Sequence, residues 1–349
     1  MKGKLSPNTI ALLDASRGLA AVYVVVHHIA QFREWTGIAR IAFKFGQEAV
    51  IVFFLLSGFV IFANEYNRIE SDLAGYAARR TRRIYPPLMI ALALSTVVFY
   101  FNGTLAEHFD LRSLGGTLLG LQDIERLKPG VIVAPYLDNE PLWSLSYEIA
   151  FYVLFPAVLT LWNKNKWLTH AIGLVCCASY LGFAQFPNHW LLVAAYFQIW
   201  WTGAMIADAY LNGHRSIRAI MAPLLWLAAA TLAAAGVTIL GGDYQLYRYP
   251  LLQFRHFGFA LFAVLVFFGP VGNIIGKLSA RAARPATLLA SISYGIYVFH
   301  YPLVVQANLV QTTSGLLGMA LCLIAVSIMG DRQISLLIRR RRKTADANA

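Results

Sequence analysis

The sequence is poor in charged residues and in cysteine. Only 13% of its 349 residues are Asp, Glu, Lys or Arg, whereas 58% are hydrophobic, which is the balance of an integral membrane protein. Its three cysteines, Cys176, Cys177 and Cys322, all lie in apolar runs without metal-ligand spacing, so we interpret them as packing residues. No soluble block of domain size separates the apolar runs. We therefore expect one membrane domain over 1–349, with its core at 10–338.

Acidic residues are scarcer than basic ones. The chain has 17 Asp and Glu against 29 Lys and Arg, a formal net charge of +12. A basic excess can indicate nucleic-acid binding, but here the basic residues form short clusters between apolar runs, as in membrane loops. No nucleic-acid partner is therefore expected. A cleaved signal peptide is not expected either, because the first apolar run carries Arg17 and a histidine pair and lacks a small-residue cleavage site.

What the sequence does contain is a series of about ten apolar runs, each long enough to cross a bilayer as a helix. They lie near 10–32, 46–64, 84–101, 142–162, 167–185, 189–211, 219–240, 255–275, 286–308 and 315–338. The runs are too long for barrel strands. The sequence therefore predicts an all-α, polytopic membrane protein, with the lipid bilayer as its surroundings.

The distribution of Lys and Arg orients these predicted spans. An even number of spans puts both termini on the same side of the membrane. Most loop arginines and lysines then fall on that side, including those in 68–83 and 339–343. Because positively charged loops stay in the cytoplasm, both termini are predicted to be cytoplasmic. Residues 339–349 would form a basic cytoplasmic tail.

The first apolar run, LDASRGLAAVYVVVHH, carries ionisable residues at both ends. Arg17 and His28 are eleven residues apart, so on a helix they point within roughly 20° of each other and lie about 16 Å apart along the axis. Asp14 is expected to pair with Arg17 one turn away, whereas His27 points about 100° away from His28. Ionisable residues inside a membrane usually face a polar cavity and serve function. We expect a fixed cation and a titratable base on one cavity wall.

Other spans carry further candidates. Glu148, in LWSLSYEIAFY, has either a functional role or a structural one as the partner of a histidine or arginine on another helix. Ser293, Tyr297 and His300 lie at i, i+4 and i+7, so they share one helix face. For this stripe, an interhelical hydrogen-bond network is the alternative to a functional site. The supporting or weaker candidates are Glu48, Ser57, Trp143 and Asp331.

Four arginines crowd into the segment RRTRRIYPP, on the predicted cytoplasmic side. If the segment is helical, Arg79, Arg80 and Arg83 share a face, and Pro86 and Pro87 begin the next span. Two interpretations stay open. The cluster is either an anchor on anionic lipid or a phosphate clamp, since guanidinium groups bind phosphate bidentately.

Five segments together resemble the integral-membrane acyltransferases of type 3, a family that includes bacterial enzymes that O-acylate carbohydrates. They are LDASRGLAAVYVVVHH, FFLLSGFVIF, RRTRRIYPP, LWSLSYEIAFYVLFP and ISYGIYVFHYPL, and they follow the family's order between residues 12 and 303. The resemblance implies a ten-helix core in the bacterial inner membrane. It also implies acyl-CoA, usually acetyl-CoA, as the donor, and no metal.

The resemblance extends to individual residues. Those that match the family's functional motifs are Arg17 and His28 in Arg-x10-His, Arg80 and Arg83 in R-x-x-R, and Glu148 in S-L-S-x-E. The chain departs from the family at Ala49, where glycine is common, and at Tyr147 and Ile149 beside the acidic residue. These differences concern substrate fit more than the class of reaction.

From the residues and the resemblance together we expect a transferase. It would move an acyl group, acetyl in the first instance, from cytoplasmic acyl-CoA to a hydroxyl of an extracytoplasmic or lipid-linked carbohydrate. Arg80, Arg83 and Arg17 would hold the phosphates, and His28 would be the general base. A transient acyl-histidine is an alternative route.

The roles of two other residues stay open at this point. Glu148 or His300 would orient His28 or help to stabilise charge at the thioester oxygen. Two other functions also stay open. In a transporter or flippase, His28, Glu148 and His300 would line a polar pathway, and in a non-catalytic scaffold His28 would not matter.

Overall fold

The computed structural model describes residues 5–268 and 270–333. Within these ranges the chain is helical, with one isolated β-bridge between Gln122 and Val133 and no strand. Ten helical stretches there are long and apolar enough to cross a membrane, which confirms the predicted all-α polytopic fold. The predicted tail at 339–349, the predicted end of the core at 338 and the side chain of Asp331 lie outside the described residues.

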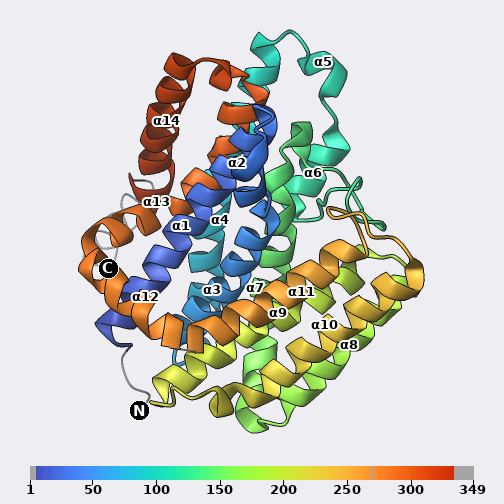
Figure 1. Cartoon of the computed structure of the whole chain (residues 1–349), viewed down its shortest axis with the longest axis vertical. Helices are drawn as coiled ribbons and strands as arrows, with labels where there is room; N and C mark the ends of the chain where they lie inside the picture. Colours follow the sequence, from blue (N-terminus) through green and yellow to red (C-terminus); the bar gives the residue numbers. More distant parts are fainter. Residues whose placement is uncertain (1–4, 269, 334–349) are drawn as a thin grey trace.

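The long helices pack into one bundle (Figure 1). They are α1 (Pro7–Phe32), α3 (Gly46–Glu65), α4 (Leu73–Phe101), α7 (Trp143–Lys164), α8 (Leu168–Gln185), α9 (His189–Leu211), α10 (Met221–Gly241), α11 (Leu251–Phe268), α13 (Ala283–Tyr301) and α14 (Thr313–Ser327). The shorter α-helices are α2 (Gly37–Ala42), α5 (Leu105–His108), α6 (Leu111–Leu119) and α12 (Pro270–Arg281). Turns of 3-10 helix lie at Tyr136–Asp138, Glu140–Leu142, Ile217–Ile220 and Leu309–Gln311, and π-helical turns at Pro302–Gln306 and Ile328–Gln333.

The predicted start of the third span is wrong. α4 begins at Leu73, so the arginine-rich segment is part of the same helix, and Pro86 and Pro87 lie inside it. The two prolines remove only two N–H donors from a helix of 29 residues, a loss that the helix tolerates. Its first turn is instead capped by Asp72, whose carboxylate accepts a hydrogen bond from Gly75 N at 2.8 Å. The arginines are therefore held on a rigid helix.

The central helix of the bundle is α9, most of whose residues are buried. It packs closely against α3 through two glycines. A Cβ atom on Gly58 would lie 1.9 Å from the carbonyl oxygen of Trp200, and one on Gly203 would lie 2.0 Å from that of Leu55. Only glycine lets the two backbones approach this closely. This contact fixes the SGF segment of α3 at the centre of the protein.

On the other side of α3 lies α1, which packs along α13 (Figure 1). α13 in turn contacts α4 and α14. α8 and α10 pack beside α9 and α11, away from α1. The candidate residues of the first, second, fourth and ninth predicted spans therefore lie on neighbouring helices, α1, α3, α7 and α13. The packing of these helices decides which candidates meet.

Candidate functional site

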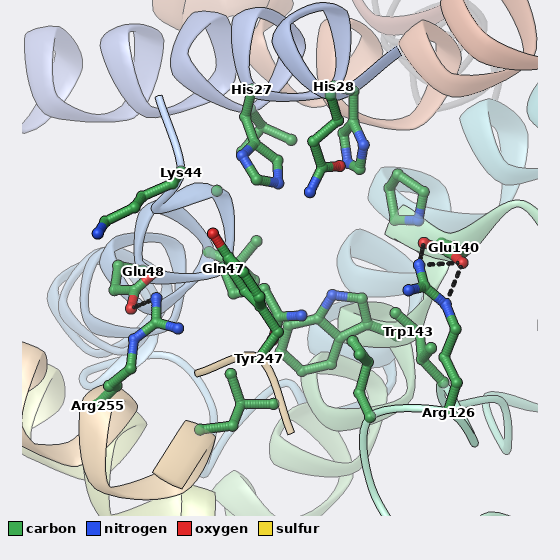
Figure 2. A pocket seen from close by; sticks show the side chains of 18 of the residues that line it. His27, His28, Lys44, Gln47, Glu48, Arg126, Glu140, Trp143, Tyr247 and Arg255 are labelled. Carbon is green, nitrogen blue, oxygen red and sulfur yellow. Dashed lines mark hydrogen bonds and ion pairs between the residues drawn. The ribbon is translucent and has the colours of Figure 1, made fainter. Parts of the chain in front are cut away.

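A cavity of about 140 Å³ lies between α1, α3, the start of α7, α11 and α13. Figure 2 shows the rings of His27 and His28 pointing from α1 into this cavity, with Trp143 on the opposite side. Two ion pairs stand at its opposite ends, Glu48–Arg255 and Arg126–Glu140. Other polar or aromatic residues that line it are Gln31, Lys44, Gln47, Tyr247 and Tyr297. The cavity is therefore polar, although it is set among membrane-spanning helices.

His28 lies beside His300, which comes from α13. The centroids of the two rings are 5.2 Å apart, and the ring of Tyr301 meets His28 edge-on at 5.1 Å. His300 Nδ1 is 2.7 Å from the carbonyl oxygen of Tyr297, which can only accept, so Nδ1 carries the proton. Its Nε2 is buried and has no hydrogen-bond partner among the described residues. His300 therefore has a fixed tautomer, with Nε2 as a free acceptor.

Tyr297 connects α13 to the start of α7. Its hydroxyl donates to the carbonyl oxygen of Pro141 at 2.6 Å and lies 2.8 Å from Ser144 Oγ. The ring lines the cavity that holds His28 and Trp143. Four residues that the sequence singled out on three separate spans thus come together here, namely His28, Trp143, Tyr297 and His300.

A buried ion pair that was not predicted from the sequence lies behind Trp143. Lys128 Nζ lies 2.7 Å from Asp123 Oδ1 and 3.6 Å from the centroid of the Trp143 ring, and both charged side chains are almost fully buried. Tyr147 also donates to Asp123, at 2.5 Å. Burial lowers the pKa of Lys128, while Asp123 opposes this shift by stabilising the ammonium. The pair lies in a loop without periodicity, so only the charges themselves were a signal.

Glu148 belongs to a second polar cluster, which does not line the His28 cavity. Its Oε1 accepts a hydrogen bond from Ser57 Oγ at 3.1 Å and another from the Tyr152 hydroxyl. Ser57 Oγ in turn accepts from Trp200 Nε1 at 3.2 Å. Along α7, Glu148 lies between Trp143, which lines the cavity, and Tyr152. The cluster therefore lies further along the same helices.

Tyr152 also lines a second pocket, of about 320 Å³, between α4 and α7. Arg80 lines it too, with its guanidinium carbon 5.7 Å from the ring centroid of Tyr152. Arg80 makes an ion pair with Glu65 at 3.3 Å, yet its buried Nε has no hydrogen-bond partner among the described residues. Most of the other lining is apolar, with Ile149 and Val153 among it. We call this pocket the α4–α7 groove.

The other arginines of the cluster have different surroundings. Arg79 donates twice to the buried Glu65, at 2.6 and 2.9 Å, and once to Asp72 at 2.9 Å. Arg83 lies over the ring of Tyr294 on α13, 4.9 Å from its centroid. Of the predicted R-x-x-R pair, only Arg80 therefore lines the α4–α7 groove. Arg79, which shares the helix face, is largely neutralised by carboxylates.

At the other end of α1, the predicted pair of Asp14 and Arg17 is present, with 3.6 Å between their charged groups. Asp14 also accepts from Thr287 Oγ1 at 2.9 Å. Arg17 lines neither the His28 cavity nor the α4–α7 groove.

His27 was expected to point away from His28, but it also lines the His28 cavity. Its Nδ1 lies 2.6 Å from the carbonyl oxygen of Phe43.

These features define a multi-pass membrane protein with a polar site at one end of its helix bundle, built on a histidine pair. Within the described ranges, no group of three His, Cys, Asp or Glu side chains is arranged to hold a metal ion. The chain belongs to an acyltransferase family, because the family model described as acyltransferase domain matches residues 10–331. The resemblance found in the sequence is thereby confirmed.

Individual relatives agree with this assignment. Nodulation protein 10 of Rhizobium leguminosarum bv. viciae is 27% identical over 73% of this chain and 71% of its own length. The acyltransferase MdmB of Streptomyces mycarofaciens is 33% identical over 52% of this chain and 49% of its own. The O-acetyltransferase OatA of Staphylococcus aureus is 26% identical over 44% of this chain and 25% of its own. No solved structure gives a significant match.

Proposed function

We propose that this protein transfers an acyl group, in the first instance acetyl, from cytoplasmic acyl-CoA to a hydroxyl of an extracytoplasmic or lipid-linked carbohydrate. Its family supports the transferase class, and its similarity to an O-acetyltransferase supports acetyl transfer to oxygen. The observation that carries the proposal is the position of His28, which lines a polar cavity next to His300. A neutral imidazole there is suited to take a proton from a hydroxyl.

In the proposed reaction the acceptor hydroxyl enters the cavity and gives its proton to His28. Its oxygen attacks the thioester carbonyl, and the C–S bond then breaks, releasing CoA as the thiolate. The thiolate takes up the proton that His28 accepted, which returns His28 to its neutral form. His300 orients His28, because its own ring is fixed by the Tyr297 carbonyl oxygen. If an acyl-histidine forms instead, acid quenching and mass analysis will locate the acyl group on His28.

The donor is assigned to the α4–α7 groove. Arg80 would bind a phosphate group of acyl-CoA, since its Nε has no hydrogen-bond partner among the described residues. Arg83 and Arg17 line neither pocket, so they would be further phosphate contacts for a part of the donor that extends beyond the groove. From Tyr152 in the groove to Trp143 in the cavity is nine residues along α7, about 14 Å. Trp143 and Tyr152 lie on opposite faces of α7, but Glu148 is one turn from Tyr152 and accepts its hydrogen bond, so the thioester would pass close to Glu148 as it leaves the groove. We assign Glu148, together with its hydrogen-bond partners Ser57 and Tyr152, to the lining of this path.

The direction of transfer follows from the predicted orientation. The arginine-rich start of α4 would lie on the cytoplasmic side, where acyl-CoA is available, and the His28 cavity would lie toward the opposite face. In a bacterium the protein would then lie in the inner membrane. The acceptor would then be a glycan or glycolipid that is accessible from outside the cytoplasm.

The test uses purified protein in liposomes with radiolabelled acetyl-CoA and envelope glycans as acceptors. Thioester turnover that depends on the acceptor, with label recovered on the glycan, is the expected result. A transporter would instead move solute without consuming thioester, and a scaffold would do neither. Mass analysis of envelope glycans from cells with and without the protein then identifies the acceptor. Absence of any thioester turnover would overturn the proposal.

A further inference from the structure

One end of the His28 cavity contains two hydrogen-bond acceptors without donors. Glu48 Oε2 and Gln47 Oε1 are buried and have no hydrogen-bond partner among the described residues, and both side chains line the cavity. Glu48 is only 4% exposed. An ionised carboxylate and an amide oxygen can only accept hydrogen bonds, and a buried acceptor left unpaired is costly. This end of the cavity is therefore suited to a ligand that donates hydrogen bonds.

The carboxylate of Glu48 is held in place by Arg255, which also lines the cavity. Arg255 of α11 donates through Nη2 to Glu48 Oε1 and through Nη1 to the carbonyl oxygen of Leu246. Its guanidinium also lies 5.4 Å from the ring centroid of Tyr247, which lines the cavity. Because Arg255 occupies Oε1, the carboxylate has a fixed orientation and Oε2 stays available. The ion pair therefore joins α3 to α11 and also fixes the orientation of the Glu48 carboxylate.

The other charges on the cavity wall do not supply the missing donors. Arg126 donates to both carboxylate oxygens of Glu140 at 2.6 Å, so its charge is compensated at the far end of the cavity. Lys44 lies over the ring of Phe45, with its nitrogen 5.1 Å from the centroid. Neither group makes a hydrogen bond to Glu48 Oε2. A bound carboxylate could not donate to this atom and would be repelled by it.

We propose that Glu48 and Gln47 form a recognition subsite that binds two hydroxyl groups of a neutral acceptor and rejects an acceptor with a carboxylate at that place. This inference rests on the proposed function, because the acceptor enters the cavity that His28 lines. Glu48 is then a specificity-determining residue and Arg255 is its positioning residue. If water alone satisfies the two acceptor atoms, changing Glu48 will not alter the preference between neutral and anionic ligands.

The test is equilibrium binding of two glycosides to the purified protein in nanodiscs. The probes are dodecyl β-D-glucoside and dodecyl β-D-glucuronide, which differ by a hydroxymethyl and a carboxylate group on the same ring. The wild type is expected to bind the glucoside at least about tenfold more tightly, as for one charge-assisted hydrogen bond gained and one repulsion avoided. Glu48→Gln should abolish or reverse this preference, because the amide removes the negative charge, can donate a hydrogen bond and leaves the charge of Arg255 uncompensated.

Two further variants keep the result interpretable. Glu125→Gln changes an exposed glutamate that does not itself line the cavity, although its loop neighbours do, and it should keep the wild-type ratio. If Glu48→Gln alone unfolds because Arg255 loses its partner, the double variant Glu48→Gln with Arg255→Gln removes both charges and takes its place. An equal affinity of the wild type for both probes, or an unchanged ratio in the Glu48 variants, overturns the inference.

The readout also separates this inference from the proposed function. Binding needs neither acyl-CoA nor catalysis. A protein that discriminates between the two glycosides but never turns over thioester would keep the subsite and refute the transferase proposal. A protein that transfers acetyl groups but binds both glycosides equally would support the transferase proposal and refute the subsite.

Discussion

His28 and His300 lie with their ring centroids 5.2 Å apart, although 272 positions separate them in the chain. One imidazole has its tautomer fixed by the carbonyl oxygen of Tyr297, and the other lines the cavity. In the proposed reaction this arrangement would assign proton transfer to His28 and the orientation of its ring to His300. The packing of α1 along α13 creates the pair.

The first prediction separates His28 from its neighbour. His28→Ala should lose acyl transfer by about 10²–10⁴-fold, the contribution of a positioned general base, and should keep acyl-CoA binding. His27→Ala should be milder, because His27 Nδ1 already contacts the carbonyl oxygen of Phe43. The wild-type rate should fall as the pH drops, since only neutral imidazole accepts a proton. Label transfer in liposomes across pH measures all three.

A wild-type rate in His28→Ala, or a greater loss of transfer in folded His27→Ala, would contradict the assignment of the base. Thermal unfolding of both variants serves as the control, because His27 packs against Gly46 and its loss affects stability. Only the folded fraction counts toward the rate.

The fold was largely predictable, because span length depends on composition alone. Ten apolar runs gave ten membrane-compatible helices. The start of α4 at Leu73 was not predictable from Pro86 and Pro87, since a long helix with a good cap tolerates prolines that would end a short one. The close approach of α3 and α9 was also hidden, although Gly58 and Gly203 permit it. Small residues show that a helix can approach another closely, but they do not show which two helices come into contact.

Most residues of the candidate site could be singled out from the sequence, but their arrangement in space could not. The sequence singled out His28 and His300 separately, and only the helix packing brings them together. From the sequence, Glu48 was only a weak candidate. Nothing there shows that Arg255 pairs with one oxygen of the Glu48 carboxylate and that the other oxygen has no partner among the described residues. From the residues alone, Arg79, Arg80 and Arg83 share one helix face, and only the resemblance singled out Arg80 and Arg83. The structure adds that Glu65 pairs with both Arg79 and Arg80, whereas Asp72 pairs with Arg79 alone of these two.

The second prediction concerns donor binding at the α4–α7 groove. Arg80→Ala should weaken acyl-CoA binding about tenfold or more, and adding Arg83→Ala should weaken it further, as charge-assisted phosphate contacts are lost. Binding to the wild type should also weaken with added salt. Titration of labelled acetyl-CoA into protein in nanodiscs measures both effects. Acceptor affinity should change little.

Arg79→Ala is the matched control for that experiment. It leaves the buried carboxylate of Glu65 with less compensation, so it should lower stability by up to about 3–5 kcal/mol. In the folded fraction, acyl-CoA binding should stay near the wild-type value. If the variant with both Arg80 and Arg83 changed binds CoA normally while folded, the cluster serves only as a lipid anchor.

The third prediction concerns orientation. Reporters fused after residue 75 and at the C-terminus should read cytoplasmic, and a reporter inserted in the 102–141 connection should read extracytoplasmic, because positive loops stay inside. Alkaline phosphatase and green fluorescent protein fusions at the same three positions provide opposite readouts. An external C-terminus would reverse the proposed direction of transfer.

The fourth prediction tests the contact between α3 and α9. Gly58→Ala places a Cβ atom 1.9 Å from the Trp200 carbonyl oxygen, so the helices must separate at a cost of about 1–3 kcal/mol. Gly236→Ala on α10 is the control, because a Cβ atom there meets nothing within 4 Å. It should be neutral or slightly stabilising. Equal melting temperatures in detergent for the two variants would show that the contact does not matter.

The last prediction concerns the ion pair behind Trp143. Lys128→Met leaves Asp123 buried without its cation, and Asp123→Asn leaves the ammonium without its anion, so each should cost about 3–5 kcal/mol. The double variant should be less damaged than the sum of the two, because no uncompensated charge remains. Exposed Arg112→Met is the control and should change stability by less than about 0.5 kcal/mol. Denaturant unfolding of the wild type, the two single variants and the double variant gives the coupling free energy between Asp123 and Lys128. Strict additivity of the two losses would mean that these residues act independently.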